Sequence, residues 1–250
     1  MHPRTEAVPS TSAGLIRDLE GRSSRRLVDA DMSFHAIREY VPGDARRQIH
    51  WKSTAKTGRL MVRQFEETRR SRLAVILSLE RDEYASPDEF ELGVSIAASL
   101  AVQALRDGRD LDVVTGAEIP RVVRGRMRSI EMIQAGTPRG LLDGFSRLNS
   151  FEHTMPLSEV CRLTVEASDT LSLAFVVCGS GTTPSGLRQA ALAFSSSTAV
   201  VAVVCDEKAP PRTRPLGELT VMTVGLLADL PGLLLRGTQT ASFSGAEAPA

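Results

Sequence analysis

Apolar residues occur along this chain in two alternating patterns. Short continuous runs of Leu, Val, Ile and Ala predict buried strands, at residues 73–77, 111–115, 171–178, 198–205 and 219–224. Apolar residues three or four positions apart predict helices, at residues 87–107, 127–135, 138–148, 155–167, 184–194 and 226–235. Strands that are apolar throughout are covered on both faces. The alternation therefore predicts an α/β fold with a doubly wound, mostly parallel sheet and helices on both sides.

The segments that flank this sheet domain, which we place at residues 73–236, differ from it in character. Residues 1–33 start with a polar, proline-containing stretch, and we expect them to form a mobile N-terminal segment. Residues 34–72 form a separate segment that we expect to pack on the sheet domain. Residues 237–250 consist mostly of small residues and predict a disordered tail.

Composition and charge indicate what the core is made of and how the parts of the chain interact. Of the 250 residues, 42% are hydrophobic and 4% are aromatic, so the core must be mainly aliphatic. Residues 1–72 carry a net charge of +6 and residues 73–250 a net charge of −6, which favours packing of the two parts. No run of about 18 apolar residues occurs, which predicts no transmembrane span. The cysteines lack zinc-site spacing and predict small buried residues in a reducing compartment: Cys161, Cys178 and Cys205.

The densest chemistry lies in residues 38–67. Proline followed by glycine suits a type II turn, and the aspartate after it can cap a short helix at residues 45–52, with a strand expected at 60–65. Two interpretations stay open for the basic groups. They form either an internal clamp, with Arg–Asp pairs and an arginine over the indole, or a docking surface for a protein or an anionic headgroup. The residues assigned to this clamp or partner surface are Arg38, Tyr40, Pro42, Gly43, Asp44, Arg47, Trp51 and Lys52.

The same stretch resembles a known family. The letters R-E-Y-V-P-G-D-A-R-R-Q-I-H-W-K at 38–52, A-K-T-G at 55–58 and V-R-Q-F-E at 62–66 resemble the signature of the bacterial domain-of-unknown-function family 58, and Thr68 replaces its usual last glutamate. The resemblance implies a von Willebrand factor A-like fold after the signature. It also implies a MoxR-type AAA+ ATPase as partner, in a chaperone-like or assembly role. A membrane hairpin usually precedes the signature, and we expect it to be lacking here through truncation or divergence.

A von Willebrand A domain would hold a divalent cation at the carboxyl ends of its strands. That site needs D-x-S-x-S after the first strand, a threonine from a middle loop and a later aspartate. Here Ser78, Glu80 and Asp82 stand at the first three positions, and Thr137 could supply the threonine. No aspartate follows Cys178. We therefore expect no bound metal and no cofactor, with a degenerate metal site as the alternative.

These observations predict a non-enzymatic protein-interaction module in the cytoplasm, either free or peripheral to the inner face of the cell membrane. The alternative is a divalent-metal-dependent adhesion domain that uses Glu80, Asp82 and Thr137. Nucleic-acid binding through the arginines of residues 121–128 is not favoured, because the series is short, lacks aromatics and sits in an acidic body. Residues 119–128 fit an edge strand or a loop equally well.

Overall fold

The structure, a computed structural model, describes residues 2–10, 37–41, 49, 51–63, 72–118, 129–168 and 171–236. Its contacts divide the chain into two compact units. The sheet unit comprises Met1–Arg26 and Ser71–Ala250, and the signature unit comprises Leu27–Arg70. Each unit has a β-sheet of its own.

The sheet unit is built on strands β3 (Arg72–Leu77), β4 (Asp110–Gly116), β5 (Ile130–Ile133), β6 (Leu171–Gly179), β7 (Ala199–Cys205), β8 (Arg212–Leu216) and β9 (Leu219–Val224). They form a seven-stranded sheet in the order β5-β4-β3-β6-β7-β9-β8. The five inner strands run parallel to one another. The edge strands β5 and β8 run antiparallel to their neighbours, so the sheet is mostly parallel, as predicted.

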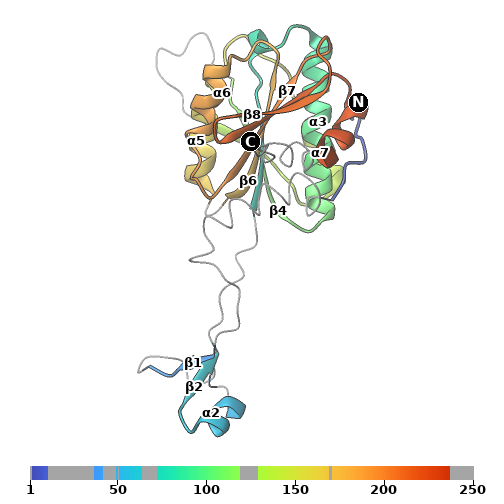
Figure 1. Ribbon diagram of the computed structural model, residues 1–250. Helices are drawn as coiled ribbons and strands as arrows, with labels where there is room; N and C mark the ends of the chain where they lie inside the picture. Colours follow the sequence, from blue (N-terminus) through green and yellow to red (C-terminus); the bar gives the residue numbers. More distant parts are fainter. Residues whose placement is uncertain are drawn as a thin grey trace, which may run out of the picture. The chain divides into compact units, whose positions relative to one another are not determined.

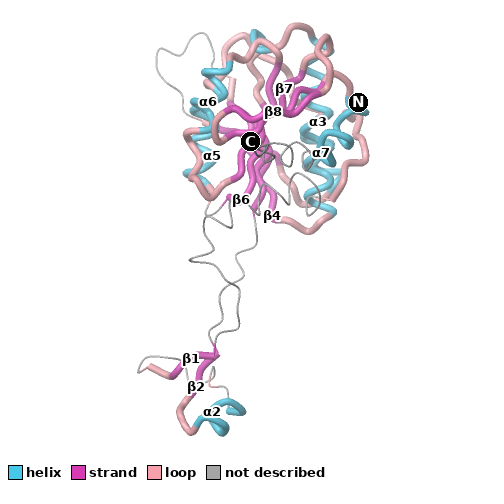
Figure 2. Tube along the Cα trace, in the orientation of Figure 1, coloured by secondary structure: helices cyan, strands magenta, loops and turns pink. Residues whose placement is uncertain are grey.

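Helices cover both faces of this sheet (Figure 1), and the sheet lies between them in the tube view (Figure 2). They are η2 (Arg81–Glu83), α3 (Pro87–Arg106), α4 (Pro138–Phe145), α5 (Leu157–Ala167), α6 (Pro184–Ala191), η3 (Leu227–Asp229) and α7 (Leu230–Arg236). α3, α4 and α7 pack on one face, and α5 and α6 pack on the other. The predicted α/β fold is therefore confirmed. None of the helices in the described part of the chain has the length and apolar character needed to cross a bilayer.

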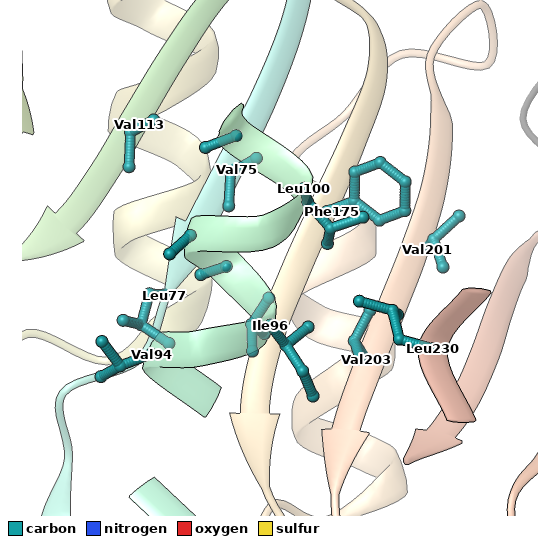
Figure 3. Packing of buried hydrophobic residues seen from close by; sticks show 14 of the residues in the cluster. Val75, Leu77, Val94, Ile96, Leu100, Val113, Phe175, Val201, Val203 and Leu230 are labelled. Atoms are coloured by element: carbon teal, nitrogen blue, oxygen red, sulfur yellow. The ribbon is translucent and has the colours of Figure 1, made fainter. Parts of the chain in front are cut away.

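The strict alternation of side chains along each inner strand divides the core in two. Val75 and Leu77 of β3 point to the first face, where they pack with Ile96 of α3 (Figure 3). Ala74 and Ile76 point to the opposite face and belong to the second cluster, with residues of α5 and α6. Because both faces are covered, every residue of the run is apolar. The cysteines are free and buried in these clusters, as expected: Cys161, Cys178 and Cys205.

The two edge strands differ from the sequence prediction. The predicted helix at 127–135 is wrong, because its described residues include β5, whose two middle residues are exposed and whose two end residues are half-buried. β8 reads R-T-R-P-L and gives no apolar run. An edge strand tolerates Pro215, since one side of an edge strand makes no ladder hydrogen bonds. Residues 119–128 lie outside the described residues.

Residues 2–10 lie along α3, although the sequence predicts a mobile segment there. Val8 is buried in the same cluster as α3, and the N–H of Glu6 donates to Ser99 Oγ at 3.0 Å. A single large apolar residue in a short segment gives no periodic signal, which is why the sequence does not reveal this contact. The rest of the predicted mobile segment and the predicted tail lie outside the described residues.

The signature unit contains β1 (Ile37–Glu39), α2 (Trp51–Thr57) and β2 (Met61–Arg63). β1 and β2 pair antiparallel, and the N–H of Tyr40 donates to the carbonyl of Leu60 at 2.8 Å. Of the helix that the sequence predicts at 45–52, Trp51 and Lys52 are helical, whereas Ile49 is not, and α2 continues past the predicted end to Thr57. Gly58, with a φ of 69°, ends it in the left-handed conformation that favours glycine.

Candidate functional site

The candidate site lies at the switch point of the sheet. β3 and β6 are neighbours, and the chain leaves them toward opposite edges of the sheet. In doubly wound sheets, ligands bind in the crevice outside the carboxyl ends of such a pair. Here that place is formed by residues 78–83 after β3 and residues 180–183 after β6.

The chain itself fills this crevice. The turn η2 folds back over the end of β6, where the N–H of Gly181 donates to the carbonyl of Glu83 at 2.8 Å. A Cβ atom on Gly179 would lie 2.2 Å from that same carbonyl oxygen and 2.6 Å from the ring of Tyr84. Only glycine permits so close an approach of two backbones. The glycines after β6 therefore accommodate the chain's own turn.

Tyr84 fixes this turn from the inside. Its hydroxyl donates to the carbonyl of Ser78 at 2.8 Å, and its ring meets Phe90 edge-on with centroids 5.2 Å apart. Burial raises the pKa of the Tyr84 phenol well above its usual value, so the group stays neutral. It acts as a packed, hydrogen-bonded anchor between η2 and α3.

The carboxylate of Glu80 accepts hydrogen bonds from the loop before α5. Its Oε2 accepts from the N–H of Thr154 at 2.8 Å and from the hydroxyl of the same residue at 3.0 Å. Glu80 also forms an isolated parallel bridge with Phe151. Arg81 adds an exposed ion pair to Glu152 at 3.5 Å. These contacts attach a loop some seventy positions away to the end of β3.

Glu89 is the buried carboxylate of the site and is 2% exposed. Its Oε1 accepts from the N–H of Ser180 at 2.7 Å and from the N–H of Ala85 at 3.3 Å, and its Oε2 accepts from the Ser180 hydroxyl at 3.1 Å. Ser86 caps α3 by accepting from the N–H of Glu89 at 3.0 Å. Glu89 thus joins the start of α3 to the end of β6.

Glu83 is the glutamate of the site with the fewest hydrogen bonds among the described residues. Burial raises the pKa of the Glu83 carboxyl, and the nearby hydroxyls of Ser78 and Thr182 offset part of that effect, while repulsion from Glu80 adds to it. Within the described residues, Glu83 Oε2 and Thr182 Oγ1 are buried and have no hydrogen bond of acceptable geometry. This carboxyl can hold a proton above the pH at which an ordinary glutamate loses it.

The degenerate metal positions do not all come together. Ser78 and Glu80 lie close, since the N–H of Glu80 donates to Ser78 Oγ at 3.3 Å, and Asp82 is exposed on the turn. Thr137 caps α4 and follows β5. Because β5 runs antiparallel to β4, it ends on the side of the sheet where the parallel strands begin, away from their carboxyl ends. The suggestion that Thr137 could join the site is corrected, and the threonine beside Glu80 is Thr154. No group of three His, Cys, Asp or Glu side chains suited to a metal occurs within the described ranges.

The signature residues are placed in part. The backbone of Arg38 pairs with Val62 in the two-stranded sheet, and Tyr40 extends that pairing. Trp51 is 67% exposed and Lys52 is exposed, both at the start of α2. The remaining predicted positions lie outside the described residues: Pro42, Gly43, Asp44 and Arg47.

Glu89 and Thr154 are functional neighbours of the crevice that the sequence reasoning missed. The local signal for Glu89 is the S-x-x-E spacing from Ser86, which is typical of a helix start with a capping box. Thr154 has no such signal, because its contact with Glu80 joins residues far apart in the chain.

Parts of this chain are similar to known proteins. A stretch of 101 residues is 32% identical to "Uncharacterized protein YeaD" of Bacillus subtilis (strain 168), which covers 40% of this chain and 22% of that protein. The chain thus matches less than a quarter of that relative's length. The fold is similar to a von Willebrand factor type A structure from Catenulispora acidiphila, with a TM-score of 0.39 and 14% identity over 71% of this chain and 43% of that one. A family model matches residues 36–209, more than half of the chain, and the protein therefore belongs to the family described as "Protein of unknown function DUF58".

Proposed function

We propose that this protein is a non-enzymatic protein-interaction module that works with a MoxR-type AAA+ ATPase in a chaperone-like or assembly role. The observation that carries the proposal is the exposure of Trp51, whose side chain is 67% accessible. A large indole left in solvent is typical of a binding surface, because tryptophan is enriched among the residues that dominate interface energetics.

The surroundings of Trp51 suit a protein partner. α2 has no buried residue, so its side chains are not used to build a core. Val41 and Leu60 are also exposed hydrophobic residues of the signature unit. Lys52 and Lys56 lie on the same helix and are exposed. Exposed apolar residues and exposed cations within one small unit match the composition of a protein interface, which has an apolar centre and a polar rim.

The switch point supports a role without catalysis. The place where this class of sheet binds ligands is filled by the chain's own turn η2. Glu80 and Glu89 accept hydrogen bonds from Thr154 and Ser180 and so serve to hold loops together. Carboxylates that are already bonded in this way are poorly suited to general acid–base work.

The internal clamp is the competing interpretation of the same residues. It requires ion pairs and an arginine stacked on the indole, which would add to stability. Among the described residues the signature unit has one ion pair, between Arg59 and Glu39 at 3.4 Å, and both side chains are well exposed. Such a pair contributes about 1 kcal/mol or less. The clamp and the docking surface are separable, because only the clamp predicts a loss of stability on mutation.

The test is a pull-down of the full chain with a MoxR-type ATPase from the same organism. Trp51→Ala and Arg47→Ala should each weaken binding about tenfold or more, as interface anchors do, with unchanged thermal unfolding. Leu192→Ala is the matched control, because Leu192 is an 82% exposed hydrophobic residue of the sheet unit. Binding by folded Trp51→Ala at the strength of the unmodified protein would refute the docking surface. A large loss of stability would support the clamp instead.

A further inference from the structure

A second candidate binding place lies beside α3. It is a pocket of about 670 Å³ in the sheet unit. Its walls are residues 2–4, the first turns of α3, the end of α4 with the residues that follow it (Phe145, Ser146, Leu148 and Asn149), Glu207 after β7 and residues 225–227 after β9. Pockets that hold small ligands or anchor side chains typically measure about 300–1,000 Å³. The pocket is thus large enough to receive an extended side chain with its neighbours.

The pocket combines an apolar floor with an acidic rim. Phe145 and Val94 are buried in the floor. The rim carries three exposed carboxylates, Asp88, Glu91 and Glu207. Within the described ranges, none of these three side chains has a hydrogen bond or an ion pair. Negative charge that the chain leaves unneutralised around an apolar hollow favours a cationic occupant.

The basic residues on the pocket wall do not neutralise this rim. His2 Nε2 lies 2.6 Å from Asp143 Oδ1, and Asp143 is not one of the lining residues. This contact with His2 lowers the pKa of the Asp143 carboxyl, which keeps the carboxylate charged. Arg4 is the other basic lining residue, and it is one cation against three carboxylates. The N-terminal segment therefore forms a wall of the pocket and leaves the rim with an excess of negative charge.

We propose that this pocket binds a basic segment of a partner protein in which Lys or Arg adjoins an apolar residue. The long aliphatic stem of such a side chain can lie on Leu92 and Leu148, which line the pocket and are half-buried, while its charged head meets the carboxylates. Leu226, which is 66% exposed, lies on the wall and offers a contact for the neighbouring apolar residue. This exposed leucine favours a peptide over a free polyamine, which has no apolar side chain to place there. The proposal goes beyond the proposed function and uses none of its residues.

The experiment uses the full chain and fluorescence anisotropy with a fluorescein-labelled peptide, Gly-Arg-Leu-Arg-Gly. Its acidic counterpart, Gly-Glu-Leu-Glu-Gly, should not bind. Glu91→Gln and Glu207→Gln should each weaken the basic peptide about threefold, and the double variant about tenfold, as exposed ion pairs do. Leu226→Ala should also weaken binding. Raising the salt from about 50 mM to about 300 mM should reduce affinity, because exposed charges are screened.

Glu131→Gln is the matched control, because Glu131 is an exposed carboxylate on β5 that does not line the pocket. It should leave the affinity unchanged. Equal binding of the basic and acidic peptides would overturn the proposal, as would an affinity that does not change in the Glu91→Gln and Glu207→Gln double variant. Displacement of the peptide by spermidine with equal affinity would assign the pocket to polyamines and would also overturn it.

Discussion

The switch-point crevice and the pocket beside α3 use carboxylates in opposite ways, although both adjoin the start of the same helix. Glu89 points into the crevice and accepts three hydrogen bonds, two of them from Ser180. Glu91, two residues later, is exposed on the rim of the pocket and has no partner within the described residues. Two positions along a helix turn a side chain to nearly the opposite direction. One carboxylate of the helix thus stabilises the fold, and the other is available to bind a partner.

The comparison teaches that the crevice where a fold of this class usually binds ligands can be filled by the chain's own backbone, while a separate pocket lies nearby. At the switch point, backbone fills the crevice, and the acids hold loops together. At the pocket, the rim acids make no hydrogen bond or ion pair to any part of the chain that the structure describes. If this distinction is right, changes in the crevice should alter stability, and changes at the pocket should not.

The largest effect is expected for Gly179→Ala. A Cβ atom there would lie 2.2 Å from the carbonyl oxygen of Glu83, so the turn η2 must move or the strand must distort. We expect a loss of about 3 kcal/mol or more in the free energy of unfolding, measured by urea denaturation, because the clash is with backbone. Gly136→Ala is the control, since a Cβ atom there meets nothing within 4 Å. Equal stability of the two variants would show that the crevice is not packed as described.

Glu89→Ala should have the next largest effect. Removing the carboxylate leaves the N–H groups of Ser180 and Ala85 without their acceptor. We expect a loss of about 2–3 kcal/mol in the free energy of unfolding, because buried donors without partners are costly. The control is Glu91→Ala, which should change stability by no more than about 0.5 kcal/mol. Similar losses in both variants would remove the contrast between the crevice and the pocket.

The sequence predicts most of the fold because the inner strands carry their own signal. Each is apolar throughout, since both of its faces are covered. β5 and β8 escape prediction because an edge strand can hold charged residues and, in β8, Pro215. The helix α2 continues past its predicted end because Gly58, and not the end of the apolar pattern, decides where it stops.

The sites are less predictable than the fold because they join distant segments. The sequence indicates that Ser78 and Glu80 follow the first strand, and the structure places them together. It cannot reveal that the Thr154 hydroxyl donates to Glu80. Nor can it reveal that the antiparallel strand β5 places Thr137 away from the carboxyl ends of the parallel strands. The pocket beside α3 depends on five separate stretches of chain, including residues 2–4. No local pattern encodes such a convergence.

The smallest effect is expected for Glu83→Gln. Among the described residues, the Oε2 atom of this crevice carboxylate is buried without a hydrogen bond. Burial raises the pKa of the Glu83 carboxyl above its ordinary value of 4.5, so the folded state holds this proton more tightly than the unfolded state. The contribution of Glu83 to stability is therefore lost as pH rises from 4.5 through the folded pKa. A neutral glutamine should remove this loss and raise stability at pH 7 by about 1 kcal/mol or less, as measured by urea denaturation across pH. Asp82→Asn, on the exposed part of the same turn, should keep the pH profile of the unmodified protein. A Glu83→Gln variant that still loses stability over the same pH window would show that another group is responsible.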